Sequence, residues 1–277
     1  MNSGFNVGNY NAPRDLLMIV ATWLACFGVT VVAEALLLPA FPDAMSDPMA
    51  LRCIAAAKNV IMLVLPALLL NKMLTEVSNG NFVSSINRPL TLKMLLTGVL
   101  VTVALVPAIS SLSLLNHQLL PQSGWLHDIA VSQDASVNAY YALVMTSRVP
   151  ADWIANIVVV ALLAGVGEEL FFRGILQGFA VRCGMRGWVA VFVVALLFSL
   201  VHFQVSEFIP RLAMGVVLGF AYLKTGRIWM PVVMHVVNNV VALVTYNHEL
   251  SLGMQCLVGL AAVAGLAAVL RLGGHKK

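Results

Sequence analysis

The chain alternates between long apolar stretches and short polar segments. An α-helix that crosses a bilayer needs about 20 mostly apolar residues, and it satisfies its own backbone hydrogen bonds. Eight stretches approach or exceed that length, and we predict a transmembrane helix in each: residues 16–40, 54–70, 94–115, 153–180, 188–203, 209–223, 228–246 and 252–272. The sixth stretch is short, so we expect that helix to begin a few residues earlier. The predicted fold class is all-α, a polytopic membrane protein.

The composition supports this prediction. Hydrophobic residues make up 60% of the chain and charged residues 10%, whereas about a quarter of the residues in soluble domains are charged. The mean hydropathy of +0.92 indicates that a lipid bilayer surrounds most of the protein. We predict a polar N-terminal tail (1–15), a single transmembrane domain (16–272) and a basic C-terminal tail (273–277). The N-terminal tail lacks the features of a cleaved signal peptide, so the first helix is expected to be retained.

The basic residues predict the orientation in the membrane. The side of the N-terminus receives Arg14, Lys72, Arg88, Lys93, Arg182, Arg186, Lys224, Arg227, Arg271, Lys276 and Lys277. The opposite side receives Arg52, Arg148 and Arg211. Cytoplasmic loops carry the excess of Lys and Arg, so we predict a multi-pass protein of the cell membrane with both termini cytoplasmic. Because the basic residues flank apolar spans, the net charge of +4 predicts no nucleic-acid partner.

Three features have more than one interpretation. Glu34 and Lys58 lie at matched depth in the first two spans; either they form an ion pair, or Lys58 extends to the interface and Glu34 is hydrated or protonated. Gly215 and Gly219 form a GxxxG pattern, which fits packing inside the bundle as well as dimerisation. The connection 116–150 either contains an interfacial helix or does not.

The fourth span carries charges in otherwise apolar sequence. Glu168, Glu169 and Arg173 lie within about two helical turns of one another. Glu169 and Arg173 are four residues apart and can pair on one helix face, whereas Glu168 points about 100° away. A buried carboxylate without a fixed partner is a candidate general base.

Two further spans supply partners for that base. His202 lies in the fifth span, four residues after Phe198, and His235 lies in the seventh span, four residues before Asn239. Measured from the predicted cytoplasmic ends at 1.5 Å per residue, these side chains and Glu168 lie at depths of about 12 to 22 Å. We therefore predict one buried polar cavity inside the bundle. Spacing alone does not choose between Asn239 and the neighbouring Asn238.

These residues suit hydrolysis by an activated water. Glu168 takes the proton from water, Asn239 donates its amide N–H to the oxyanion, and Arg173 holds Glu169 in place. The imidazoles of His202 and His235 either bind a metal, such as Zn²⁺ together with Glu168, or hold the water and the oxyanion by hydrogen bonds.

The motifs Glu168-Glu169-x-x-x-Arg173, Phe198-x-x-x-His202 and His235-x-x-x-Asn239 resemble those of the CPBP family. This is the CAAX protease and bacteriocin-processing family of intramembrane proteases, often called metalloproteases. The resemblance covers the motif-bearing core, residues 153–246. It implies an all-helical fold, a hydrophilic cavity open towards the cytosol, and an endopeptidase acting on peptides or membrane proteins. It also implies catalytic roles for Glu168, Glu169, His202, His235 and Asn239, with Arg173 and Phe198 in support.

Two other functions fit the same residues. A non-catalytic membrane scaffold or regulator can retain such a pocket, since fold does not guarantee activity. A cation or proton transporter can use intramembrane Glu and His residues as a relay. Clustering of the polar groups at one depth favours the protease over the relay.

Overall fold

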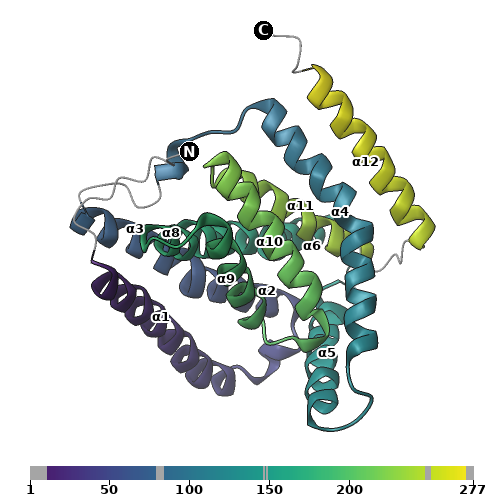
Figure 1. The fold of residues 1–277 in the computed structure, drawn as a ribbon. Helices are drawn as coiled ribbons and strands as arrows, with labels where there is room; N and C mark the ends of the chain where they lie inside the picture. Colours follow the sequence, from purple (N-terminus) through teal and green to yellow (C-terminus); the bar gives the residue numbers. More distant parts are fainter. Residues whose placement is uncertain (1–10, 79–83, 146, 148, 247–250, 273–277) are drawn as a thin grey trace.

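The computed structural model describes residues 11–78, 84–145, 147, 149–246 and 251–272. These residues form an all-α membrane protein, in which six helices are long and apolar enough to cross a membrane (Figure 1). The helices that precede the motif-bearing core are α1 (Ala12–Ala40), α2 (Pro48–Asn59), η2 (Val60–Val64), α3 (Leu65–Ser78), α4 (Leu92–Leu119) and α5 (Trp125–Val144). The rest are α6 (Pro150–Asn156), η4 (Ile157–Leu163), α7 (Ala164–Glu169), η5 (Leu170–Gln177), α8 (Gly178–Arg182), α9 (Gly187–Leu200), η6 (Val205–Glu207), α10 (Phe208–Thr225), α11 (Trp229–Tyr246) and α12 (Leu252–Leu272).

Each predicted span falls on a helix, with one correction. The fifth was predicted to reach residue 203, but α9 ends at Leu200. The next residues form a tight turn in which the His202 N–H bonds to the Ser199 carbonyl, and Phe203 adopts a φ of 49°. A left-handed residue cannot continue an α-helix, so His202 lies in a turn. The sixth helix begins one residue before the predicted start, as expected, and η6 precedes it.

The second and fourth spans contain π-helical segments. In the span Pro150–Arg182, η4 and η5 lie on either side of α7, which carries both glutamates. In the second span, η2 separates α2 from α3. A π turn holds more residues than an α turn, so it changes the direction of the side chains that follow, and π segments occur often at functional sites.

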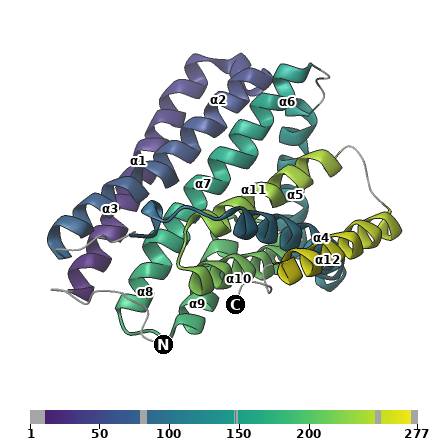
Figure 2. The ribbon, with the colours of Figure 1, turned by 90° about the horizontal axis from the view of Figure 1, so that it is seen from above.

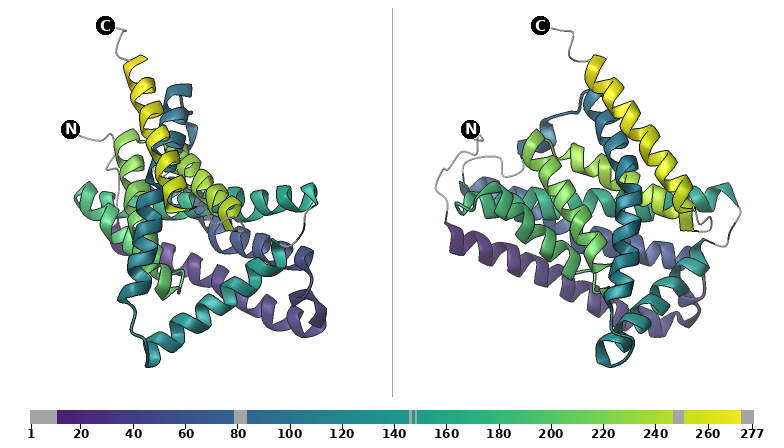
Figure 3. Two further views of the ribbon diagram at one scale, coloured as in Figure 1. Left: turned by 90° about the vertical axis from the view of Figure 1, so that its right-hand side faces the viewer. Right: turned by 45° about the vertical axis from the view of Figure 1, so that its right-hand side comes forward.

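The helices form two groups. Figure 2 shows α1, α2–α3 and the helix from α6 to α8 running alongside one another, with α4, α10 and α12 crossing them. The helix α11 packs against both groups, since it contacts α4 and α10 as well as η4 and α7. Figure 3 shows α12 lying along α4 at the outside of the bundle.

Glycines allow close packing around α7. A Cβ atom at Gly165 would lie 3.0 Å from the side chain of Val236 on α11, and one at Gly167 would lie 3.0 Å from Val64 in η2. Real Cβ atoms seldom make such short contacts. The helix α7 is therefore held between η2 and α11. This fixes the position of Glu168, which comes directly after Gly167 in the same helix.

The GxxxG pattern serves packing within the bundle. A Cβ at Gly215 would lie 3.1 Å from the Cβ of Ala195 on α9, and one at Gly219 would lie 2.9 Å from Val191. The two glycines thus let α9 and α10 approach closely.

The connection 116–150 contains a helix, α5. Its C-terminal end meets Arg52 of α2, which is buried and bonds to the Val144 carbonyl at 3.0 Å. Arg52 also pairs with Asp152 at 2.7 Å and donates to Asn156. These contacts join α2, α5 and α6 at one end of the molecule (Figure 1).

Of the two interpretations of Glu34 and Lys58, the structure shows the ion pair. The Lys58 Nζ atom lies 2.7 Å from the Glu34 Oε1 atom. The pair is partly exposed, with 46% and 34% of the two side chains accessible.

Candidate active site

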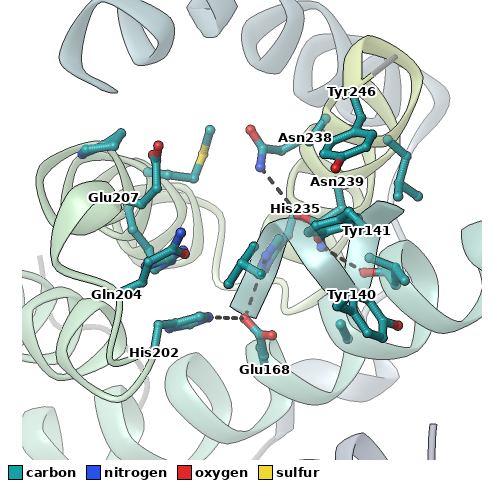
Figure 4. Close-up of a pocket in the computed structure, with 18 of the residues that line it drawn as sticks. Tyr140, Tyr141, Glu168, His202, Gln204, Glu207, His235, Asn238, Asn239 and Tyr246 are labelled. Atoms are coloured by element: carbon teal, nitrogen blue, oxygen red, sulfur yellow. Dashed lines mark hydrogen bonds and ion pairs between the residues drawn. The ribbon is translucent and has the colours of Figure 1, made fainter. Parts of the chain in front are cut away.

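A cavity of about 680 Å³ opens between α5, α10 and α11 (Figure 4). The fourth span and the α9–α10 connection complete its walls. A second pocket, of about 320 Å³, lies beside Trp23, Met62 and Phe172. Both pockets reach Glu168 and His202, so these two side chains lie where the two spaces meet.

Glu168 faces both histidines. Its Oε2 atom lies 3.8 Å from the His202 Nε2 atom and 3.7 Å from the His235 Nε2 atom. These distances are too long for hydrogen bonds, and this oxygen has no hydrogen-bond partner among the described residues. The three atoms converge in Figure 4.

The hydrogen bonds at Nδ1 assign the tautomers of both imidazoles. His202 Nδ1 lies 2.6 Å from the Phe198 carbonyl, which can only accept. His235 Nδ1 lies 2.7 Å from Glu169 Oε1, and an ionised carboxylate also only accepts. Each Nδ1 therefore carries a proton. In the neutral rings, each Nε2 presents a lone pair towards Glu168.

Glu169 occupies a different environment although it is the next residue. Its side chain is fully buried, and Arg173 Nη1 lies 2.7 Å from Oε1, as the spacing predicted. Arg173 also donates to the Gly215 carbonyl at 3.0 Å, and Gln177 donates to the Gly219 carbonyl at 3.1 Å. We call Glu169, Arg173 and Gln177 the sealed cluster. It joins the fourth span to α10.

Phe198 lies between the sealed cluster and the histidines. The Arg173 guanidinium carbon lies 4.7 Å from the centre of its ring, a distance typical of a cation–π interaction. The ring of His202 lies 4.8 Å away and that of His235 lies 5.8 Å away. Phe198 thus packs against both imidazoles, while its carbonyl orients one of them.

Both asparagines of α11 line the cavity. Asn239 Nδ2 lies 3.4 Å from the Val160 carbonyl in η4, and Asn238 Nδ2 lies 3.4 Å from Asn239 Oδ1. Both bonds are long, so they restrain the amides weakly. The Asn239 amide thus lies beside the fourth span, on the wall of the cavity (Figure 4).

Sequence reasoning missed the wall that α5 provides. Tyr140 and Tyr141 project from α5 into the cavity (Figure 4). Burial raises the pKa of both hydroxyls above the usual value, so both remain protonated donors. The polar composition of the connection 116–150 was the only available signal for this wall.

The start of α10 also contributes Arg211, which the sequence indicated only as a basic residue on the side opposite the N-terminus. Arg211 lines the cavity, and its Nη2 atom donates to Gln204 at 2.8 Å. Its Nη1 atom has no hydrogen-bond partner among the described residues.

Polar contacts hold the turn that carries His202. Asp134 of α5 accepts hydrogen bonds from Ser206 and from Gln204. On α4, Asn116 donates to the Val205 carbonyl at 2.9 Å and accepts from the Ile209 N–H at 2.9 Å. The connection 201–207 is thus fastened to both α4 and α5, although it is not helical throughout.

Glu168, His202 and His235 offer donor atoms of the kinds that bind a metal, but they are not grouped around one ion position. Zinc binds donor sets of this kind, made of two neutral imidazole Nε2 atoms and a carboxylate. In such sites the Nδ1 atom of each ring is usually hydrogen-bonded to an acceptor, as it is here. Among the residues that the structure describes, however, no three His, Cys, Asp or Glu side chains are placed to hold one ion. Zinc at Glu168, His202 and His235 stays a prediction.

Comparison with known proteins bears on the same segment. The family model "Type II CAAX prenyl endopeptidase Rce1-like" matches residues 150–241. A Bacillus subtilis (strain 168) protein named "Putative membrane peptidase YdiL" is 27% identical over 110 residues. That match covers 37% of this chain and 45% of the relative, so the chain spans less than half of the relative's length. No solved structure matches. The comparisons confirm the predicted CPBP-family resemblance, and the matched segment holds all three motifs.

Proposed function

We propose that this chain, whose residues 150–241 match the Rce1-like family, is an intramembrane protease that hydrolyses peptide bonds with a water activated by Glu168. One observation carries the proposal. In a cavity that opens to the surface, Glu168 Oε2 faces two imidazole nitrogens at 3.7 and 3.8 Å. The opposite nitrogen of each ring is already bonded to an acceptor.

The proposed chemistry begins with a water between these groups. The water donates one hydrogen to Glu168 and the other to Nε2 of His202 or His235, and its lone pair is left to face the substrate carbonyl. As the oxygen attacks the carbonyl carbon, Glu168 accepts the proton. General base catalysis of this kind contributes about 10²- to 10⁴-fold to the rate.

The second stage expels the amine. The bond between the carbonyl carbon and the amide nitrogen breaks, and Glu168 returns its proton to the leaving nitrogen. Water and a peptide bond thus give a carboxylic acid and an amine. While negative charge lies on the former carbonyl oxygen, the Asn239 amide is the N–H donor proposed to stabilise it. No Ser or Cys nucleophile is needed.

The proposed substrates are peptides or membrane proteins whose scissile bond lies near the bilayer. The cavity is lined by tyrosine, asparagine and glutamine side chains as well as apolar ones, which suits an extended peptide backbone. A peptide satisfies such donors and acceptors along its length, whereas a lipid chain does not.

Zinc remains a separate prediction. If the ion binds, Glu168, His202 and His235 hold it, and it supplies Lewis-acid activation of the water. Incubating the purified enzyme with a chelator, and then restoring Zn²⁺, measures whether activity depends on it. A direct binding measurement on His202→Ala, which removes one donor, tests the same ligand set without an activity assay.

The proposal is tested by comparing peptide termini in cells that carry the wild-type protein or Glu168→Gln at matched expression. New termini present only with wild type are expected, and they identify both the substrate and the bond. Glu34→Gln serves as the control, because it removes a carboxylate that lies outside the cavity. Identical termini with wild type and Glu168→Gln would overturn the proposal.

A scaffold or a transporter would give other results. A scaffold keeps its phenotype in Glu168→Gln. A proton or cation transporter shows ion flux in proteoliposomes that depends on Glu168 or His202.

A further inference from the structure

The cavity occupies one half of the bundle. Its α11 residues all belong to the C-terminal part of that helix, from His235 to Tyr246, and its α10 residues all belong to the first part, from Pro210 to Met214. On the fourth span (Pro150–Arg182), its residues run from Val159 to Glu168, and none comes from the part that follows Glu168. These helices alternate in direction, so all three groups lie towards the same end of the bundle.

The remaining walls lie at that end too. Gln204 and Glu207 come from the α9–α10 connection, and Tyr140 and Tyr141 come from α5, which joins α4 to α6. Both connections lie on the side opposite the one from which α1 begins. Figure 1 shows α5 at the end of the molecule where α1 ends and α2 begins.

The other half of the bundle, on the side of Glu168 away from α5, is closed. The sealed cluster lies there with its side chains buried, and Phe171, Ile175 and Leu218, on the same helices, are at most 5% exposed. Through the larger cavity, water reaches Glu168 from the side of α5. The second pocket also reaches Glu168, and its wall includes Ala55 and Asn59 of α2, which line the larger cavity as well.

The charges identify that side. On the side of the N-terminus, the exposed basic side chains among the described residues are Lys72, Arg88, Lys93, Arg186 and Lys224. On the side of α5, Arg52 is buried in contacts with Asp152 and Asn156, and Arg211 lies within the cavity wall. With Arg148, these are the three basic residues assigned to that side, against eleven on the side of the N-terminus, so the positive-inside bias is retained.

We infer that the cavity opens at the extracytoplasmic face of the membrane. Cytoplasmic termini and a cavity open to the cytosol were both expected, but this geometry allows only one of them. The charge distribution favours cytoplasmic termini, and it is a property of this chain rather than of a resemblance. If the proposed function holds, the substrates are extracytoplasmic segments of membrane proteins or exported peptides.

The test uses three single-cysteine proteins. One keeps the native Cys183, which is exposed in the turn after α8, with the other cysteines changed to Ala. The other two lack all native cysteines and carry Asn138→Cys at the cavity rim or Asn59→Cys in its wall; both positions line the cavity. Intact cells are treated with a charged, membrane-impermeant thiol reagent, before and after permeabilisation.

We expect Asn138→Cys and Asn59→Cys to react in intact cells, and Cys183 to react only after permeabilisation. Inside-out vesicles should reverse the order. Reaction of Cys183 but not Asn138→Cys in intact cells would overturn the inference, as would an Asn59→Cys that reacts only in inside-out vesicles. Size-exclusion profiles in detergent control for folding. The assay needs no catalysis, so its failure is distinct from failure of the proposed protease activity.

Discussion

Two adjacent glutamates lie in two different environments. Glu169 belongs to the sealed cluster, where Arg173 and His235 both donate to its Oε1 atom at 2.7 Å. Glu168 belongs to the cavity, where its Oε2 atom lies 3.7 Å from His235 Nε2, too far for a hydrogen bond. One carboxylate is engaged by the protein, and the other remains available to a water or a substrate.

The difference shows how a membrane protein separates stability from chemistry within one helix. A buried charge is tolerated when it is paired and hydrogen-bonded, so the sealed cluster can lie in the closed half of the bundle. A carboxylate without a partner is costly in an apolar interior, and a cavity open to water lowers that cost. His235 links the two regions, since it bonds to Glu169 through Nδ1 and faces Glu168 through Nε2.

The largest expected effect comes from Glu168→Gln. The variant keeps the size of the side chain but removes the base, so we expect activity to fall by about 10²- to 10⁴-fold while the thermal unfolding temperature changes little. Turnover and thermal unfolding of the purified protein measure this. Activity near the wild-type level would refute the role of Glu168 as base.

Arg173→Met should instead lower the stability of the protein. It leaves the Glu169 charge buried without its partner, which costs about 3 to 5 kcal/mol of stability, and activity is lost because the fold is lost. The double variant Glu169→Gln with Arg173→Met should cost less than the sum of the single variants. Additive losses would show that the two residues do not act as a pair.

Asn239→Ala is expected to lower kcat by about 10²-fold, the usual effect of removing one oxyanion donor, with little loss of stability. Asn238→Ala, the matched neighbour, should have a smaller effect because, among the described residues, the hydrogen bond of its amide goes to Asn239 rather than to the fourth span. If Asn238→Ala proved damaging and Asn239→Ala silent, the roles of the two asparagines would have to be exchanged.

Asp134→Ala tests whether α5 positions the turn of His202. It removes the acceptor for Ser206 and Gln204, and such bonds contribute about 1 to 3 kcal/mol. We expect a roughly tenfold loss of kcat, corresponding to about 1.4 kcal/mol, and partial recovery in Asp134→Asn, which retains an acceptor. Equal activity in wild type and Asp134→Ala would show that α5 does not orient His202.

The smallest effect is expected at the partly exposed pair of Glu34 and Lys58. Glu34→Gln should cost less than about 1 kcal/mol and leave activity unchanged. The double variant with Lys58→Met should be less damaging than the sum of the single changes. Strict additivity in thermal unfolding would mean that the ion pair contributes no coupling energy.

Local spacing alone predicted much of this protein. Apolar length located the spans, because a helix in lipid must satisfy its own backbone. The pairing of Glu169 with Arg173 also followed from spacing, since residues four apart on a helix are neighbours. The placement of Glu168 away from that pair followed from the same geometry.

Contacts between distant segments decided the rest. The turn after α9, the fastening of that turn by Asp134 and Asn116, and the cavity wall from α5 depend on residues about 70 to 93 positions apart, which no local pattern relates. The side on which the cavity opens was equally hidden, because it depends on which ends of several helices remain unfilled. Apolar periodicity specifies that a helix crosses the membrane, whereas only packing between helices specifies where space is left.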